Sequence, residues 1–202
     1  MGKKRGKQVM RRVKVVGISG SRRASSFNTS LLNLAISRLE NFGAEVNSID
    51  LRALDIPFYD ADYEKANGLP ADVKTVREKI RDSDLMLVAT PEYNGFPPGI
   101  LKNVLDWISR KNETDDPPLE AYKGKVAALM SATIGGSGGV RALTTMTTQL
   151  NYLGVMVLPD KFSLPHASKY FGDTENTAAL TGLDEFLKLS TQRVVNHVMS
   201  FE

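Results

Sequence analysis

A polar segment begins at Gly17, where the sequence reads GISGSRRASSFN. It follows the apolar run VKVVGI and precedes a stretch in which leucines return at helical spacing. A loop that leads from a strand into a helix presents backbone N–H groups and a helix N-terminus, which together bind anions. The serines add neutral donors, and Arg22 or Arg23 adds positive charge. This combination predicts a site for a phosphate monoester.

A simpler role for the same segment is to cap the helix that follows it. Ser25, Ser26 or Asn28 could provide the side-chain oxygen that accepts a hydrogen bond from the first helical turn. Capping needs one such residue, whereas this segment has several together with two arginines, so phosphate binding is favoured. Neither the P-loop pattern GxxxxGK[ST] nor the dinucleotide fingerprint GxGxxG is present.

A second candidate loop, TPEYNGFPPGILKNVLDW, begins at Thr90. Pro91 stiffens the exit from an apolar run, Tyr93 and Phe96 offer flat faces, and Asn94 offers a donor and an acceptor. A rigid loop of this kind fits a planar heterocycle such as a flavin. The alternative is an ordinary Pro/Gly turn around a buried tyrosine.

A third loop, ATIGGSGGVRA, has four glycines within five residues. Because glycine loses much conformational entropy on folding, this density indicates a close approach of backbone to ligand or a mobile lid. A plain flexible loop is the alternative.

The third loop also satisfies the nucleophile pattern GxSxG around Ser137. Asp160 or Asp173, and then His166 or His197, follow in the chain order that a serine hydrolase requires. A short pattern within a glycine-rich loop matches easily by chance, so we rank a hydrolase low. His197 is expected to pack against the body of the protein.

Apolar, β-branched runs alternate with segments of helical periodicity, which predicts an α/β fold with parallel strands and helices on both faces. The carboxyl ends of such strands meet at one edge of the sheet, where ligands bind, so all three loops should gather there. Segments 52–70 and 111–124 are expected to be long loops with functional or subunit contacts. Strands are expected at 13–18, 44–51, 84–90, 125–133 and 155–158, and helices at 31–42, 73–80, 100–108, 143–150 and 183–198.

The first two loops resemble the NADPH-dependent FMN reductase family, which includes quinone, azo-dye and chromate reductases of flavodoxin-like fold. The family pattern GSxRxxSxN matches from Gly20 to Asn28, and PEYNxxxPGxLKNxxDW matches from Pro91 to Trp107. The second match is long and specific, and the resemblance extends over about residues 13–158.

The resemblance implies a flavodoxin-like three-layer αβα sandwich, with a five-stranded parallel sheet of order 2-1-3-4-5 in a single FMN-binding domain over residues 13–202. It implies FMN as cofactor, NADPH or NADH as co-substrate, and ping-pong transfer of hydride to quinones, azo compounds or free flavin. It also implies a homodimer or homotetramer with helix 100–108 in the contact, and Trp107 on the helix surface or in that interface.

Carried over residue by residue, the resemblance assigns the first loop to the FMN phosphate, the second to the ring and ribityl chain, and the third to the opposite side. Arg22 stands where the family has an aliphatic residue, so either arginine could contact the phosphate. No catalytic acid or base is implied, because the flavin carries the chemistry. The expected FMN-binding residues are Ser19, Ser21, Arg23, Ser26, Phe27, Asn28, Pro91, Glu92, Tyr93, Asn94, Gly95, Ser131, Gly135 and Gly136.

The amino-acid composition argues against several classes of protein. There is no cysteine and only two histidines, which argues against disulfides, thiolate catalysis and a metal site. Seven of the 26 cations fall in the first fourteen residues, so we expect residues 1–12 to be a disordered basic arm. The remaining chain has 19 cations against 23 acids and predicts no nucleic-acid partner.

No apolar run is long enough for a bilayer and no signal-like core is seen at the start, so a cytoplasmic protein without a membrane partner is expected. A flavodoxin-type electron carrier is the main rival to an enzyme. Such carriers are strongly acidic, whereas this chain beyond its basic start is only mildly so.

Overall fold

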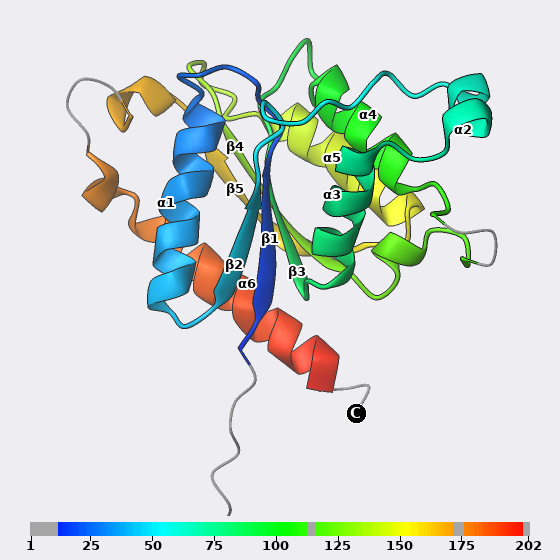
Figure 1. Ribbon diagram of the computed structural model, residues 1–202. Coiled ribbons are helices and arrows are strands. Elements are labelled where there is room, and N and C mark those ends of the chain that lie inside the picture. Colours follow the sequence, from blue (N-terminus) through cyan, green and yellow to red (C-terminus); the bar gives the residue numbers. More distant parts are fainter. Residues whose placement is uncertain (1–11, 113–115, 172–175, 200–202) are drawn as a thin grey trace, which may run out of the picture.

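The computed structural model describes residues 12–112, 116–171 and 176–199, so only the last residue of the predicted basic arm falls within it. Five parallel strands form one sheet in the order β2-β1-β3-β4-β5, which confirms the predicted topology (Figure 1). The first four strands match the predicted ranges to within two residues at each end. The strands are β1 (Lys14–Ser19), β2 (Glu45–Ile49), β3 (Leu85–Ala89), β4 (Val126–Ala132) and β5 (Met156–Leu164).

Helices cover both faces of the sheet and complete the three layers. On one face lie α1 (Phe27–Asn41) and α6 (Thr181–Met199). On the other lie α3 (Ala71–Arg81), α4 (Gly99–Ile108) and α5 (Val140–Tyr152). All five predicted helices are therefore present, along with the short 3-10 turns η1 (Glu120–Tyr122), η2 (Ala167–Lys169) and η3 (Thr177–Ala179).

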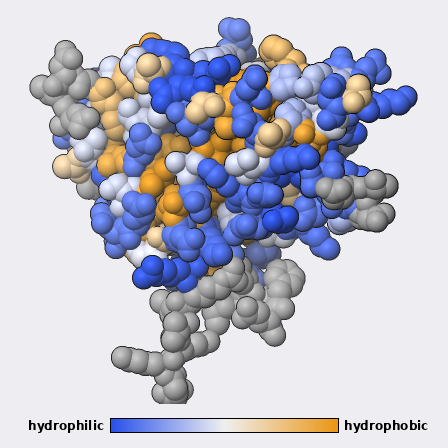
Figure 2. Space-filling model, viewed as in Figure 1, coloured by the Kyte–Doolittle hydropathy of each residue, from blue (hydrophilic) through white to orange (hydrophobic). Residues whose placement is uncertain are grey.

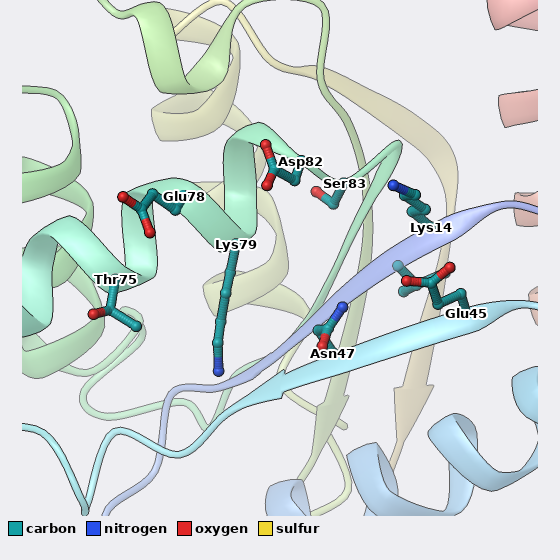
Figure 3. Close-up of a pocket in the computed structure, with 9 residues that line it drawn as sticks. Lys14, Glu45, Asn47, Thr75, Glu78, Lys79, Asp82 and Ser83 are labelled. Atoms are coloured by element: carbon teal, nitrogen blue, oxygen red, sulfur yellow. The ribbon is translucent and has the colours of Figure 1, made fainter.

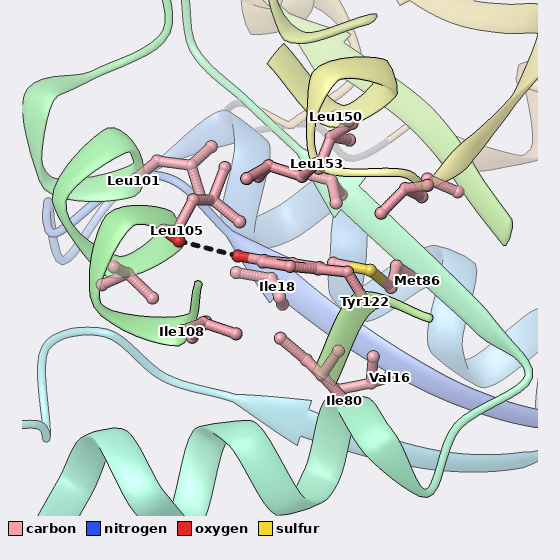
Figure 4. Close-up of a cluster of buried hydrophobic side chains, with 14 of the residues drawn as sticks. Val16, Ile18, Ile80, Met86, Leu101, Leu105, Ile108, Tyr122, Leu150 and Leu153 are labelled. Atoms are coloured by element: carbon pink, nitrogen blue, oxygen red, sulfur yellow. Dashed lines mark hydrogen bonds between the residues drawn. The ribbon is translucent and has the colours of Figure 1, made fainter. Parts of the chain in front are cut away.

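Two hydrophobic clusters, one on each side of the sheet, form the core. Successive strand residues point to opposite faces, so Val15 packs toward α1 and α6 while Val16 packs toward α3, α4 and α5. The cluster on the side of α3, α4 and α5 surrounds Tyr122, whose hydroxyl donates to the carbonyl of Leu105 at 2.8 Å (Figure 4). Burial raises the pKa of Tyr122 well above its usual value, so this buried phenol stays neutral.

Strand β5 ends six residues beyond the predicted range of 155–158. A bulge places residues 158–160 opposite the single residue Ala128, and regular pairing resumes where Leu129 faces Lys161. Pro159 lies in this bulge, where its missing N–H costs the ladder nothing. The sequence Pro-Asp-Lys therefore interrupts the strand without ending it.

The segment predicted as a loop at 52–70 contains a helix, α2 (Ala61–Asn67), so that prediction was incomplete. Asp60 begins the helix as its N-cap, and its side chain accepts hydrogen bonds from the N–H groups of Asp62 and Tyr63. The helix has no buried residue among those the structure describes, so it lacks the periodic apolar pattern that would reveal it.

Trp107 was expected on the helix surface or in a subunit interface, and this was wrong. Its side chain is fully buried with Leu69 and Val73 in a small third cluster. Its indole N–H donates to the carbonyl of Pro57 at 2.8 Å, and its ring meets Tyr59 edge to face at 5.0 Å. The tryptophan therefore holds segment 56–59 against α4.

Arg77 holds the second long segment, 111–124, in a similar way. This buried arginine donates to the carbonyls of Ile108 and Arg110, and it forms ion pairs of 3.2 Å with Asp116 and Glu120. Trp107 thus fastens segment 56–59 to α4, and Arg77 fastens Asp116 and Glu120 of the second long segment to α3.

Candidate functional site

The loops that follow the strands gather at the carboxyl edge of the sheet, at the top of Figure 1. Backbone hydrogen bonds join neighbouring strands just beyond their ends: Gly20 N–H to Ala89 at 2.8 Å, and Thr90 N–H to Met130 at 2.9 Å. The edge therefore brings the three predicted loops together. It also includes a fourth loop, after β5, that the sequence pattern does not single out.

Hydroxyl groups fix the shape of the first loop. The side chain of Ser26 caps α1 by accepting from the N–H of Thr29 at 3.4 Å, as the capping alternative expected. The Ser21 hydroxyl accepts from the N–H of Arg23 at 3.3 Å, and the Ser19 and Thr29 hydroxyls lie 3.0 Å apart. Capping therefore uses one of the several hydroxyls and leaves the anion-binding interpretation open.

Buried hydroxyls and exposed cations share this first loop. Ser19, Ser21 and Ser26 are buried, while Arg22 and Arg23 are both exposed. The first backbone N–H groups of any helix have no partner within the helix, and at α1 they face this loop. Neutral donors, a helix N-terminus and two guanidinium groups thus occur within seven residues.

Asn28 connects the first loop to the third. Its side chain is buried, with its amide nitrogen donating to the carbonyl of Ala132 at 2.8 Å and its amide oxygen accepting from the N–H of Ala132 at 2.9 Å. Both polar groups of this amide are used in a reciprocal pair. Asn28 therefore sets the separation between α1 and the end of β4.

A tight turn displays the aromatic rings of the second loop. Tyr93 and Phe96 exchange two backbone hydrogen bonds of 2.8 and 3.0 Å, and positive φ values of 52° at Asn94 and 83° at Gly95 define a type I′ turn. Tyr93 is 47% exposed and Phe96 62% exposed. The alternative of a turn around a buried tyrosine is therefore excluded.

Glu92 leaves the second loop to reach the N-terminus of α5. One carboxylate oxygen accepts from the N–H groups of Arg141 at 3.0 Å and Ala142 at 3.2 Å, and the other pairs with the Arg141 guanidinium at 3.1 Å. The N-cap residue of α5 is Gly139, which has no side chain to supply. Glu92 therefore caps α5 from another loop.

The four glycines of the third loop divide into two pairs. Gly138 and Gly139 have positive φ values of 60° and 82°, and a Cβ would lie 2.1 Å from the Ser163 hydroxyl at the first and 1.9 Å from the Ser131 hydroxyl at the second. This pair is required by packing. Gly135 and Gly136 are exposed and have space for a Cβ, so their backbone stays open to a ligand.

Ser131 lies beneath Gly139 and is fully buried. Its hydroxyl has no hydrogen-bond partner among the residues that the structure describes. Of the other expected residues, Pro91 packs beside Gly20 and Phe27 packs against the cluster of α1 and α6. The expected set therefore contains exposed groups, such as Arg23 and Tyr93, and buried groups that position them.

The serine hydrolase alternative gains no support from the geometry. Ser137 is exposed and makes no hydrogen bond to a histidine within the described residues, and Asp173 lies outside them. The backbone of Ser137 is not in the left-handed region either. A nucleophile elbow needs a strained serine that is hydrogen-bonded to its base.

A pocket of about 300 Å³ lies at the opposite, amino edge of the sheet, between β1, β2 and the end of α3 (Figure 3). Its lining includes both signs of charge, with Lys14 near Glu45 and with Glu78, Lys79 and Asp82 on or just after α3, so it favours neither anions nor cations. Lys79 also donates to the carbonyl of Ser48 at 3.2 Å. No glycine lines this pocket, in contrast to the carboxyl edge.

Apolar surface is concentrated in the central and upper part of the face shown in Figure 2, toward the carboxyl edge. In the described ranges, no cluster of three or more histidine, aspartate or glutamate side chains could hold a metal ion. None of the helices in the described part of the chain is long and apolar enough to cross a membrane.

Comparisons with known proteins agree with this geometry. Residues 13–169 match the model of a family described as NADPH-dependent FMN reductase. The chain is 40% identical to an NAD(P)H-dependent FMN reductase of Pseudomonas aeruginosa over 71% of its length and 72% of the relative's. It is 37% identical to a quinone reductase of Escherichia coli over 73% of its length and 74% of that protein's.

Among solved structures, the flavoenzyme FerB of Paracoccus denitrificans, an NAD(P)H:(acceptor) oxidoreductase, superposes with a TM-score of 0.76. The two sequences are 26% identical, and the alignment covers 92% of this chain and 98% of the other. The likeness therefore extends over most of the chain.

Proposed function

Because the chain belongs to the NADPH-dependent FMN reductase family, we propose that it is an FMN-dependent oxidoreductase that uses NAD(P)H to reduce quinones. Bound FMN supplies the acceptance and transfer of hydride, a chemistry that protein side chains lack. The chain's own residues bind the cofactor, orient it and leave one face open. Free flavin and azo compounds are further acceptors of the same kind.

One observation carries the proposal: the N-terminus of α1 is open at the carboxyl edge, with two exposed arginines beside it. Charge-assisted hydrogen bonds from guanidinium groups and helix N–H groups are the usual means of holding a phosphate. The N-terminus of α5, by contrast, is occupied by the carboxylate of Glu92. The FMN phosphate is therefore assigned to the first loop, with Arg22 or Arg23 as its cation.

The remaining loops fit a flat ring. The type I′ turn at Asn94 and Gly95 presents Tyr93, and the open glycines 135 and 136 allow backbone to approach without a side chain between. Buried Asn28 and half-buried Glu92 hold these loops at fixed positions. We propose that these two residues act by positioning the loops, and that the contacts with FMN come from their exposed neighbours.

The nicotinamide of NAD(P)H and the acceptor would use the same open face in turn. The oxidised nucleotide has to leave before the acceptor binds, which produces ping-pong kinetics. We further propose that the enzyme is a homodimer or homotetramer and that it works in the cytoplasm, where NAD(P)H is available. An electron carrier without turnover is disfavoured, because the similar proteins are named as reductases.

The proposal is tested with the purified full-length protein. We expect a yellow protein whose visible flavin absorbance bleaches when NADPH is added under anaerobic conditions and returns when a quinone is added. Steady-state NADPH consumption with the quinone distinguishes an enzyme from an electron carrier. A colourless protein that does not take up added FMN would contradict the proposal.

A further inference from the structure

His166 lies in the fourth loop of the carboxyl edge, directly after β5, and the proposed function does not yet use it. Its side chain is exposed. Its backbone is joined to the third loop, because its N–H donates to Gly135 at 3.3 Å and the N–H of Ala167 donates to Thr133 at 2.9 Å. The histidine is thus fixed to the loop whose glycines are open.

The backbone of His166 is in the left-handed region, with φ at 51°. Residues with a Cβ adopt this conformation at a cost, and they keep it where surrounding contacts enforce it. Here the carbonyl of His166 also accepts from the N–H of Lys169 at 2.9 Å. The direction in which this side chain leaves the chain is therefore set by the fold.

The imidazole ring lies beside the open backbone of Gly136. Its Cε1 and Nε2 atoms are both 3.8 Å from the position that a Cβ on Gly136 would occupy. Neither ring nitrogen has a hydrogen-bond or ion-pair partner within the described part of the chain. The fold thus holds an imidazole that has no protein hydrogen-bond partner beside Gly136, where the proposed site for the flavin ring is lined by backbone alone.

Quinone reduction consumes one proton in addition to a hydride. Conversion of a quinone to a hydroquinone adds two electrons and two protons, and a hydride supplies both electrons but only one proton. We propose, on the premise of the function above, that the imidazolium form of His166 gives the second proton from Nε2 to the carbonyl oxygen of the quinone and becomes a neutral imidazole. The imidazole then regains a proton from solvent, so that protons and electrons balance.

Other groups near this loop are less suited to the role. Residues 133–139 include no acidic or basic side chain. Arg141 pairs with Glu92, and a guanidinium does not release its proton in proteins. Lys169 is a cation on the same turn as the histidine, and it faces solvent. Histidine is the side chain that most often serves as a general acid.

The test compares two acceptors in the FMN-loaded enzyme. His166→Asn keeps the left-handed backbone, which asparagine tolerates, and removes proton transfer. We expect kcat/KM for 1,4-naphthoquinone to fall by about 100-fold, the usual scale for a lost general acid. Turnover with ferricyanide, which takes electrons without protons, should stay at the wild-type level. His197→Asn, on α6, is the matched control and should change neither rate.

A second measurement is independent of turnover. In the oxidised holoenzyme without NAD(P)H, 1,4-naphthoquinone should shift the imidazole proton resonance of His166 and leave that of His197 in place. The inference would be overturned, with the proposed function intact, if His166→Asn kept the wild-type kcat/KM for 1,4-naphthoquinone or lost activity with both acceptors by the same factor. An unmoved His166 resonance would overturn it as well. Failure of the wild-type protein to bind FMN would instead contradict the proposed function itself.

Discussion

The N-termini of α1 and α5 lie at the same edge of one sheet, and each follows a strand and a loop of small residues, yet the chain uses them differently. At α5 a carboxylate of the protein, Glu92, accepts from two of the first N–H groups. At α1 a serine hydroxyl accepts from one, and two arginines stand exposed beside the rest. A helix N-terminus is an anion site only where the protein has not already supplied the anion.

The largest expected effect concerns the closed end at α5. Gly139→Ala would place a Cβ 1.9 Å from the Ser131 hydroxyl at a φ of 82°. We expect the free energy of unfolding of the apoprotein to fall by about 2–5 kcal/mol, from overpacking and left-handed strain together. Urea denaturation measures this change.

Gly135→Ala, in the same loop, is the control for Gly139→Ala. It has open space and no positive φ, so its free energy of unfolding should change by less than about 1 kcal/mol. Equal destabilisation by the two substitutions would show that the glycine pairs do not differ.

The second effect concerns the open end at α1. Replacing the arginine that contacts the phosphate, Arg23→Ala or Arg22→Ala, should raise the Kd for FMN by about 10- to 100-fold, because one charge-assisted hydrogen bond is lost. Flavin fluorescence titration measures it.

Riboflavin, which lacks the phosphate, provides the control for the arginine variants, since its affinity should not change. If riboflavin and FMN weaken alike in both variants, the arginines act on something other than the phosphate. An unchanged FMN affinity in both would move the phosphate site away from the first loop.

The third effect is smaller and tests whether the carboxylate of Glu92 caps α5 or contacts the cofactor. Glu92→Gln keeps the shape and removes the charge that faces the helix dipole. The free energy of unfolding should fall by about 1 kcal/mol, while the Kd for FMN should change much less than in Arg23→Ala. A stable variant that binds FMN weakly would place the carboxylate on the cofactor instead.

The smallest effect separates capping from binding at Ser26. Glycine is nearly as good an N-cap as serine, so Ser26→Gly should alter the free energy of unfolding by only a few tenths of a kcal/mol. If the hydroxyl also contacts the phosphate, the Kd for FMN should rise by roughly threefold to tenfold. An unchanged Kd would leave Ser26 with capping alone.

The sheet and its five main helices could be predicted from the sequence because burial on both faces leaves a strong apolar pattern, as in Leu85–Ala89. Helix α2 could not, since none of its described residues is buried, although Asp60 and Gly68 are good end signals. Trp107 was misplaced because its partners come from segment 56–73, whose fold the local pattern does not indicate.

The candidate site was predictable as a set of loops and less so in the role of each residue. Hydroxyl groups, arginines and glycines in the loops correctly predicted that the candidate site lies at the carboxyl edge of the sheet. Asn28 hydrogen-bonds Ala132, which is 104 positions away in the sequence. Glu92 hydrogen-bonds the first N–H groups of α5, which are 49 and 50 positions away. The local sequence pattern does not indicate such distant partners. The packing of Gly138 and Gly139 on serines of β4 and β5 likewise needed the strand register.

The burial of the chain's single tryptophan has an optical consequence. Trp107 belongs to neither of the two clusters that hold the sheet, but to the small one under segment 56–59. Its emission therefore reports on the detachment of that segment, whereas far-ultraviolet circular dichroism reports on the strands and helices. Superimposable melting curves from the two signals would mean that this outlying patch and the sheet unfold as one cooperative unit.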